Sequence, residues 1–370
     1  SKEMTVVNRL VLQNLLHRPI RTLLSVLAVA VEITLILTVV GLCHGMLEES
    51  ARRTRGVGAD ILIRPSTTQA AMAVSSADLS EKLVPLIAAF PKVEMATGTT
   101  VQMLTSNLQS ITGVDLDGFS RMSGGLKYLA GGPFEQPYDA VIDEVWARQN
   151  KLQVGQSMPL WNRNFRVSGI VEPGKLSRVF IPIATMQDLL GWKGKLSQIY
   201  LKLRNHDDTP LVIAELKVQF PGYNIYSVEE FTSLFSINNF AGINQFIRVM
   251  IGLGVIIGFL VVMLSMYTAI LERTREIGIL KSLGASPFYI VSIVIRETFL
   301  LAVLGIGVGI GFSFGTKAAI ERYFPILVVS LHQEWWLWGT LIAVGGAMLG
   351  ALYPAFRAAR QDPIAALAYE

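Results

Sequence analysis

Four long apolar runs constrain what this chain can fold into more than any other feature. They cover residues 20–42, 249–271, 288–315 and 335–353. A helix needs roughly 20 predominantly apolar residues to cross the hydrocarbon core of a bilayer, and each run comes close to that length or exceeds it. Hydrophobic residues make up 51% of the chain and charged residues only 16%, a balance too apolar for an ordinary soluble protein. The sequence therefore predicts an α-helical integral membrane protein with four transmembrane helices.

The first run is expected to stay in the protein as a membrane anchor. It is longer than the apolar core of a secretory signal peptide, which has about 7 to 15 residues, and it leads into residues 43–49 without a small-x-small cleavage site. Cys43 is the only cysteine of the chain, so no disulfide can form within it.

Positive charges next to the apolar runs predict the orientation. They cluster at the ends that we assign to the cytoplasm: Lys2, Arg9, Arg18, Arg21, Arg273, Arg275, Lys281, Arg357 and Arg360. The positive-inside rule then places both termini and the loop 272–287 in the cytoplasm. Arg52, Arg53 and Arg55 lie at the opposite end of the first run, but they lead into a long segment, and long domains cross membranes largely regardless of charge. The cytoplasmic flanks account for the formal net charge of +4, so nothing calls for a nucleic-acid partner.

The segment between the first and second runs changes character and predicts an extracytoplasmic α+β domain inserted between helices 1 and 2. Short β-rich runs alternate there with amphipathic segments and turn residues. The expected strands are 60–64, 94–104, 109–114, 165–170, 179–183 and 197–203. The expected helices are 76–90, 143–151, 184–190 and 210–220.

Both connections between the membrane and this domain are predicted to be helical. Ser227 and Glu230 have the spacing of a capping box. A helix that ran unbroken from there to Leu271 would have about 44 residues and a length of roughly 66 Å, about twice the hydrocarbon thickness. The first run likewise continues to Arg55, where Gly56 offers a C-cap. The two extensions would form a helical stalk outside the membrane.

These patterns divide the chain into nine expected parts. They are an N-terminal cytoplasmic amphipathic segment (1–19), transmembrane helix 1 with its stalk (20–55), the extracytoplasmic core domain (56–226), the second stalk with transmembrane helix 2 (227–271), a cytoplasmic helix (272–287), transmembrane helix 3 (288–316), a short extracytoplasmic loop (317–334), transmembrane helix 4 (335–355) and a cytoplasmic tail (356–370).

The loop between the second and third runs is short and charged, and residues 271–285 read LERTREIGILKSLGA. Charged residues precede apolar ones, which predicts an amphipathic helix: Glu272, Arg273, Arg275 and Glu276, then Ile277, Ile279, Leu280 and Leu283. Gly284 is expected to end the helix, because glycine adopts the left-handed conformation at little cost. Such a helix can dock into a groove of a partner protein or lie on the lipid surface, and the residues alone leave both interpretations open.

Two further segments carry motifs. One contains GVDLDGF at 113–119, GGPF at 131–134, VIDEVWA at 141–147, GQSM at 155–158 and FRVSGI at 165–170, and the other is YPAFRAARQDPIAAL at 353–367. Together with residues 271–285 they resemble the permeases of the MacB/FtsX-like ABC transporter family, the mechanotransmission (type VII) class. The resemblance implies that the charged loop is a coupling helix that docks on an ATPase. Its residues with this implied role are Glu272, Arg273, Arg275, Glu276, Ile277, Gly278, Leu280, Lys281, Leu283 and Gly284.

The resemblance also implies partners and an activity. These are a permease homodimer in the bacterial inner membrane and a separate ATPase dimer that holds ATP and Mg, with motion passed along the stalk to the outer domain. Family members export macrolides or peptides with a periplasmic adaptor and an outer-membrane duct, extract lipoproteins, or regulate cell-wall hydrolases, and the sequence does not select among these. A membrane-anchored ligand sensor is the alternative of another class. It would need a cytoplasmic signalling domain, whereas the predicted cytoplasmic loop has roughly 15 residues.

Three polar residues fall within the predicted spans. Glu32 lies near the middle of the first span, where a charge costs about 2.5 to 3.5 kcal/mol on insertion scales. We expect a neutral carboxyl that is hydrogen-bonded to a neighbouring helix, for example through Tyr267 or Ser265, in preference to a substrate or dimer contact. Arg296 and Glu297, near the inner end of the third span, are expected to snorkel or pair.

Glycines of the third and fourth spans have small-xxx-small spacing and predict helix-packing faces. They are Gly305, Gly307, Gly309, Gly311, Gly315, Gly346 and Gly350.

The sequence holds no recognisable catalytic motif. No G-x-x-x-x-G-K-[ST] phosphate loop occurs, and no G-x-G-x-x-G register can be completed. The histidines, His17, His44, His206 and His332, lack a second ligand at zinc spacing. We therefore expect a permease subunit without catalytic residues, cofactor or metal of its own.

Overall fold

The computed structural model describes residues 19–66, 77–104, 109–239 and 241–361. The chain forms two compact units, which are named here the helical unit (Ser1–Cys43, Gly242–Ile320 and Val329–Glu370) and the α+β unit (His44–Ala241 and Glu321–Val328).

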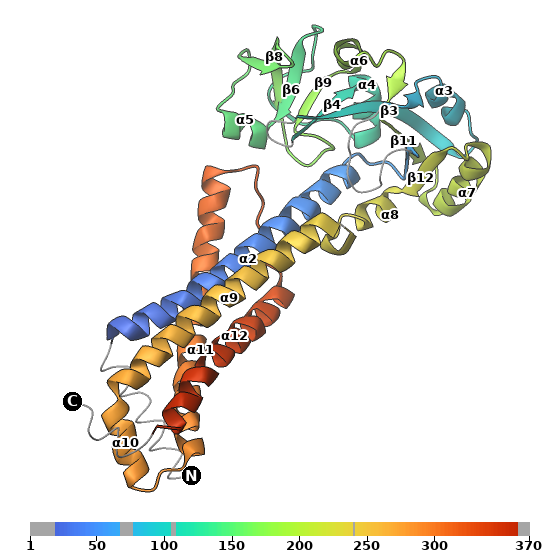
Figure 1. Ribbon diagram of the computed structural model, residues 1–370. Coiled ribbons are helices and arrows are strands. Elements are labelled where there is room, and N and C mark those ends of the chain that lie inside the picture. The colour runs from blue at the N-terminus through green and yellow to red at the C-terminus, as the bar shows by residue number, and fades with distance from the viewer. Residues whose placement is uncertain (1–18, 67–76, 105–108, 240, 362–370) are drawn as a thin grey trace. The chain divides into compact units, whose positions relative to one another are not determined.

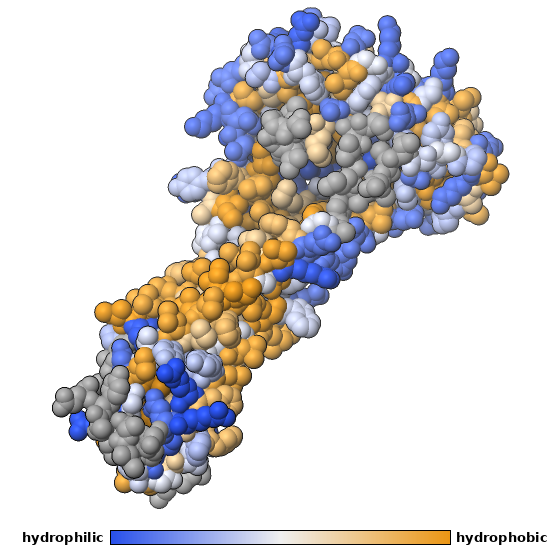
Figure 2. Space-filling view, viewed as in Figure 1, coloured by the Kyte–Doolittle hydropathy of each residue, from blue (hydrophilic) through white to orange (hydrophobic). Residues whose placement is uncertain are grey.

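Four long helices make up most of the helical unit (Figure 1). They are α2 (Pro19–Arg55), α9 (Ala241–Glu272), α11 (Pro287–Tyr323) and α12 (Gln333–Ala359). Each is long and apolar enough to cross a membrane, and hydrophobic residues dominate their visible surface in Figure 2. The predicted fold class, with four spans and an α+β domain between the first and second, is confirmed. Two helices are longer than expected, because α11 continues past residue 316 and α12 continues past residue 355.

Glycines let the helices of this unit approach closely. A Cβ atom on Gly309 of α11 would lie 2.7 Å from the Ala30 carbonyl oxygen of α2, and one on Gly350 of α12 would lie 2.7 Å from the Phe259 oxygen of α9. Thr34 of α2 uses the close approach and donates to the Gly309 carbonyl at 3.0 Å. Gly305 and Gly346 also meet neighbouring helices, so the predicted packing role holds for these four.

The prediction is wrong for the other three. Added Cβ atoms on Gly307, Gly311 and Gly315 would meet no atom of the described residues within 4 Å. The three glycines therefore do not mark a packing face within the helical unit, although they share the small-xxx-small spacing.

Replacing Gly309 by valine is expected to disrupt the packing of α11 on α2. The added side chain would meet the backbone of Ala30, and backbone cannot move aside as a flexible side chain can. Purified Gly309→Val protein should unfold at a clearly lower temperature in detergent than the wild type. Gly307→Val is the matched control, since its side chain enters open space on the same helix. Equal melting temperatures for the two variants would contradict the assigned packing face.

A ten-stranded sheet is the framework of the α+β unit (Figure 1). Its strands are β1 (Ile61–Pro65), β3 (Val93–Leu104), β4 (Gln109–Val114), β5 (Tyr128–Gly131), β6 (Asp139–Asp143), β7 (Ser157–Leu160), β8 (Arg163–Val171), β9 (Val179–Pro182), β11 (Gln198–Leu203) and β12 (Tyr223–Ser227). Their order is β12-β1-β11-β3-β4-β9-β6-β8-β5, and β7 pairs with β8. The first strand after α2 thus lies antiparallel to the last strand of the sheet, with Ile61 opposite Ser227. A separate two-stranded ladder joins β2 (Leu79–Ser80) to β10 (Lys195–Leu196).

Short helices cover both faces of the sheet. They are α3 (Leu83–Ala88), α4 (Leu116–Ser123), α5 (Glu144–Asn150), α6 (Ile183–Leu190), α7 (Thr209–Gln219) and α8 (Val228–Ser233), with 3-10 turns η1 (His206–Asp208) and η2 (Ile237–Asn239). Alternate residues of β1 enter different clusters. Ile61 and Ile63 belong with Val212 of α7, whereas Leu62 belongs with Phe119 of α4. Successive strand residues point to opposite faces, so β1 is buried on both sides.

The predicted strands match observed ones to within two residues at each end, but several elements were missed. The prediction lacks β2, β5, β6, β7, β10, β12 and α4. The predicted helix at 76–90 is too long, because the described part of that segment holds β2 and then the shorter α3. Ladder pairing of Leu79–Ser80 with Lys195–Leu196 overrides the local helical pattern.

The expected unbroken helix from Ser227 to Leu271 is also wrong. The capping bond from the Glu230 amide to the Ser227 hydroxyl forms at 2.9 Å, yet α8 ends at Ser233 and α9 begins only at Ala241. In between, the Asn239 side chain donates to a backbone carbonyl at 3.4 Å, a local bond of the kind that competes with helix formation. The first stalk is a continuous helix to Arg55, as predicted.

Candidate functional site

The charged loop forms a short helix, α10 (Thr274–Ser282), between α9 and α11. Gly284 follows it with φ of +94°. The Gly284 amide donates to the Lys281 carbonyl and the Ala285 amide to the Leu280 carbonyl, both at 3.0 Å. These two bonds make a Schellman motif, which satisfies carbonyls that a helix end leaves open. The end of the helix lies where the sequence predicted it.

One face of α10 is fixed to the helical unit. Ile277 is 9% exposed and belongs to the core cluster of this unit. The Lys281 ammonium group donates to the carbonyl oxygens of Ala359 at 2.8 Å and Gln361 at 2.5 Å. These bonds cap the end of α12, where the helix leaves carbonyls without intrahelical partners. The inner face of α10 therefore holds both apolar and polar anchors.

Glu297 ties the start of α10 to two transmembrane helices. Its side chain, on α11, is 2% exposed and pairs with Arg21 of α2 at 2.8 Å and with Arg273 at 3.2 Å. Removing one partner of such a buried ion pair is costly, because a desolvated charge is left behind. The pairing expected for Glu297 is confirmed, while Arg296 beside it is only half-buried.

The opposite face of α10 is exposed and mixes charge with apolar surface. It carries Arg275, Glu276, Ile279 and Leu283, and the last two are 44% and 79% exposed. The expected division into one charged and one apolar face is therefore too simple, since Ile277 points inward while Ile279 and Leu283 point outward. An exposed surface with apolar centres and flanking charges suits a protein groove.

The C-terminal motif packs the end of α12 against α9. The Arg357 guanidinium lies 4.9 Å from the centre of the Tyr267 ring, and Tyr353 stacks on the same ring at 6.5 Å between centroids. Residues 362–367 of the motif lie outside the described residues.

Glu32 occupies a notch between α2, α9 and α12. Its side chain is 4% exposed, and neither carboxyl oxygen has a hydrogen-bond partner in the described part of the chain. A Cβ atom on Gly258 of α9 would overlap the carboxyl group, and one on Gly346 of α12 would lie 3.7 Å from it. The expected partners are wrong. Ser265 instead shares a 2.5 Å hydroxyl bond with Ser25, and Tyr267 stacks on Tyr353.

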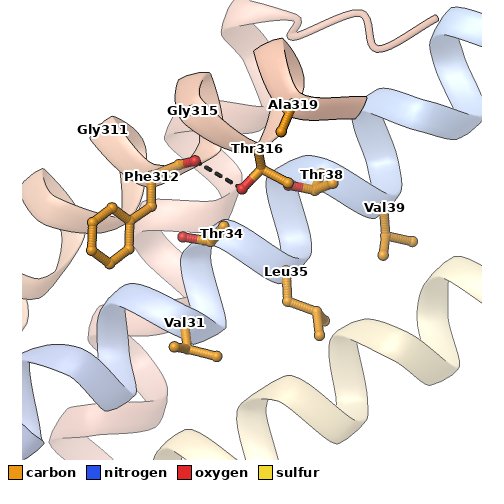
Figure 3. A pocket seen from close by; sticks show the side chains of 10 residues that line it. All are labelled: Val31, Thr34, Leu35, Thr38, Val39, Gly311, Phe312, Gly315, Thr316 and Ala319. Carbon is orange, nitrogen blue, oxygen red and sulfur yellow. Dashed lines mark hydrogen bonds between the residues drawn. The ribbon is translucent and has the colours of Figure 1, made fainter. Parts of the chain in front are cut away.

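A groove between α2 and α11 offers no acid, base or nucleophile arrangement (Figure 3). It is lined by Val31, Thr34, Leu35, Thr38, Val39, Gly311, Phe312, Gly315, Thr316 and Ala319. Two of its hydroxyls bond to backbone, since Thr34 donates to the Ala30 and Gly309 carbonyls and Thr316 donates to the Phe312 carbonyl. No group of three metal-ligating side chains occurs among the described residues.

Comparisons with known proteins agree with this architecture. The family model of the MacB-like periplasmic core domain matches residues 22–219, and that of the FtsX-like permease C-terminal region matches residues 248–363. The chain belongs to the MacB/FtsX-like ABC transporter permease family. Along the chain, the region that matches the core domain comes first and the region that matches the permease C-terminus follows it.

Two relatives and one solved structure illustrate the likeness. The macrolide export ATP-binding/permease protein MacB of Burkholderia cenocepacia is 26% identical over 95% of this chain and 56% of its own length. The uncharacterized ABC transporter permease YknZ of Bacillus subtilis is 30% identical over 53% of this chain and 50% of its own length. The crystal structure of the periplasmic region of MacB from Actinobacillus actinomycetemcomitans is 16% identical, covers 51% of this chain and 97% of that structure, and gives a TM-score of 0.38. The chain spans about half the length of these two relatives.

The residues predicted to couple this permease to an ATPase divide into two sets. Arg273, Ile277, Gly278, Leu280 and Lys281 are buried or half-buried, whereas Glu272, Arg275, Glu276, Leu283 and Gly284 are exposed. Sequence reasoning missed Arg21 and the carbonyls of Ala359 and Gln361 as partners of this site. The one signal in the sequence that could have identified Arg21 as a partner of Glu297 is that both are charged residues near the ends of apolar runs.

Glu32→Gln is expected to leave assembly and activity of the permease intact. Glutamine keeps the shape and the hydrogen-bonding capacity of a neutral carboxyl, and the notch offers no cationic partner among the described residues. Expression, detergent stability and ATP-dependent activity should match the wild type. The contrasting variant is Gly258→Val, whose side chain would overlap the carboxyl group and should lower stability. Normal expression of Glu32→Gln without activity would show that a charge at this position is required.

Proposed function

We propose that this permease couples ATP hydrolysis in a separate ATPase subunit to movement of its extracytoplasmic α+β domain. The two-sided helix α10 carries the proposal. Its exposed face presents Glu276, Ile279 and Leu283, while its inner face is tied to α2, α11 and α12 through Glu297 and Lys281. A partner that moves α10 would therefore move three helices at once.

The ATPase subunit would hold ATP and Mg, and this chain would hold no cofactor. The family, and the ATP-binding/permease designation of the MacB relatives, support an ATPase partner. On this proposal, α10 and both termini face the cytoplasm of a bacterial cell. The coupling role extends to the exposed Glu272 and Arg275 and to Gly284, which ends the helix.

A second copy of the permease is the proposed partner within the membrane. Of the four spans, α9 is the least buried by the rest of the chain, since only 22% of its most apolar stretch is buried. Its exposed apolar residues recur at helical spacing: Phe246, Val249, Leu253, Ile256, Ile257, Leu260 and Leu264. A face of this kind fits another helix as well as lipid. We place the homodimer contact along α9 and α2.

The proposed activity is export or extraction of an amphipathic cargo such as a drug, a peptide, a lipid or a lipoprotein. The relatives named for macrolide export support it. A periplasmic adaptor and an outer-membrane duct would complete the route for an exported cargo.

Co-reconstitution tests the proposal. The permease, purified from its native membrane with any ATPase that binds it, is placed in liposomes, and vanadate-sensitive ATP hydrolysis is measured together with release of a macrolide or a lipoprotein. We expect hydrolysis that requires both subunits and release that requires ATP. An ATPase that never binds the permease would refute the coupling function. Normal hydrolysis without release of either cargo would favour a permease that regulates an extracytoplasmic partner.

A further inference from the structure

A buried ionic cluster joins separate chain segments inside the α+β unit. Arg178 precedes β9, Asp143 ends β6 and Glu49 lies near the outer end of α2. Their side chains are 3%, 1% and 12% exposed. The Arg178 guanidinium also donates to the carbonyl of Ile326, in the segment between α11 and α12. One arginine thus contacts the sheet, the end of α2 and the connection between the last two long helices.

The contacts of Arg178 differ in length. Its bond to Asp143 measures 3.1 Å, whereas its distance to Glu49 is 3.8 Å and to the Ile326 oxygen 3.5 Å. Asp143 is itself fixed, because it accepts the Trp146 amide at 2.7 Å as the N-cap of α5. Arg178 is therefore held firmly by the domain and more loosely by the segments that continue into long helices.

Electrostatics make Asp143 dependent on its cationic neighbours. Burial raises the pKa of Asp143, while Arg178, the Trp146 amide and Arg53 favour its ionised form. A buried ion pair contributes little net stability compared with an apolar pair of the same shape. We therefore attribute to these charged groups a role in fixing geometry and not in adding stability.

The backbone around the cluster is in close contact with α2. The Leu176 amide donates to the Arg53 carbonyl at 2.8 Å. A Cβ atom on Gly56 would overlap the carbonyl of Gly174, so the close approach requires glycine at the end of α2. Glu49 has a second partner, Arg52, at 2.9 Å on the same helix. It can exchange Arg178 for Arg52 without becoming an unpaired charge.

We propose that Arg178 is a positioning residue that passes displacement of α2 and of the α11–α12 connection to the α+β domain. The proposal rests on the coupling function proposed above. Asp143 holds the guanidinium in place, and Glu49 and the Ile326 carbonyl are the groups through which it follows the two moving segments. Neutralising the contacts should loosen the domain from the stalk without unfolding it.

Two variants separate this role from a purely structural one. Glu49→Gln removes the charge that Arg178 meets on α2. The double variant Asp143→Asn with Arg178→Gln makes the central pair neutral and keeps an N-cap for α5, because asparagine caps helices as well as aspartate does. Glu172→Gln is the matched control, since it also neutralises a glutamate of the same unit, but one whose ion pair, with Lys127, is exposed. Thermal unfolding should be unchanged in Glu49→Gln and in the control.

The first measurement does not depend on the ATPase. Spin labels on cysteines at the exposed positions Met46 and Lys193, in a Cys43→Ser background, report the distance between α2 and the domain. We expect a narrow distance distribution in the wild type and the control, and a broad one in both neutralised variants. Distributions that stay narrow in folded variants would overturn the proposal.

The second measurement tests transmission. With the ATPase bound, both neutralised variants should hydrolyse ATP normally, while ATP-dependent cargo release falls roughly tenfold, about the effect of losing one hydrogen bond to a charged group. Broadened distances with unchanged release would overturn the role of Arg178. Failure of the coupling function has a different signature, namely wild-type permease to which no ATPase binds. Even without a bound ATPase, broadened distance distributions would still show that Arg178 links α2 to the domain.

Discussion

Glu276→Lys combined with Gly284→Val is expected to abolish recovery of the ATPase with the permease. Glu276 is exposed on the outer face of α10, so the reversed charge meets the partner directly. Gly284 has φ of +94°, a conformation that costs a β-branched residue roughly 1–2 kcal/mol or more, and valine there would distort the Schellman motif and the exposed Leu283 beside it. Affinity purification of the tagged permease measures the loss.

Insertion into the membrane should be unaffected by this change. Both residues are exposed, and an added Cβ on Gly284 would meet no atom of the described part of the chain within 4 Å. Lys127→Glu serves as the control, because it reverses an exposed charge on the α+β unit. Full recovery of the ATPase with the doubly substituted permease would refute the docking role of α10.

Nucleotide should bring the stalks of two copies together. Single cysteines at Ser236 or Asn239, in a Cys43→Ser background, are expected to cross-link between copies with a non-hydrolysable ATP analogue and much less without it. Both positions lie in the interrupted segment between α8 and α9, and Asn239 is exposed. Motion of packed helices can be passed to a distant domain, and the continuous helix α2 is the connection that can carry it here.

The cross-linking control is a cysteine at Lys193, an exposed position far along the chain from either stalk. It should not cross-link in any nucleotide state. Equal cross-linking at Ser236 with and without nucleotide would mean that the stalk is a static support, and the proposed mechanotransmission would be refuted.

Periodicity and length were enough to predict the four spans and six of the twelve strands in the described part of the chain. The apolar runs are long, and β1, β4 and β11 are bounded by turn residues, so local pattern and tertiary structure agree there. Prediction failed where the deciding contacts, whether distant or local, do not change the periodicity of the sequence. The ladder at Leu79–Ser80 depends on residues 195–196, and the break before Ala241 depends on local side-chain bonding that periodicity does not reveal.

The sequence predicted the position and the end of the helix α10, but not the contacts that its residues make. A short charged helix with a terminal glycine could be expected from residues 271–285, but its two faces could not, because Ile277 and Ile279 are chemically equivalent in the sequence. Their difference arises from packing against the helical unit. Likewise, no local feature could pair Glu297 with both Arg21 and Arg273, residues that come together only in the folded bundle.

The pairing of β1 with β12 limits how a single copy can move. The chain enters β1 at Ile61 directly after α2 and leaves β12 at Ser227 directly before α8, and these two residues are opposite each other in the ladder. Pulling α2 and α8 apart would therefore break the hydrogen bonds of the β1–β12 ladder one after another, starting at Ile61 and Ser227. A ladder that opens in this way offers little resistance to the pulling force. The Arg55 side chain, which donates to the Thr232 hydroxyl at 3.3 Å, holds the same end closed. On the proposed dimeric mechanism, we therefore expect the two strands of each copy to move as a pair, and any large separation to occur between the stalks of different copies.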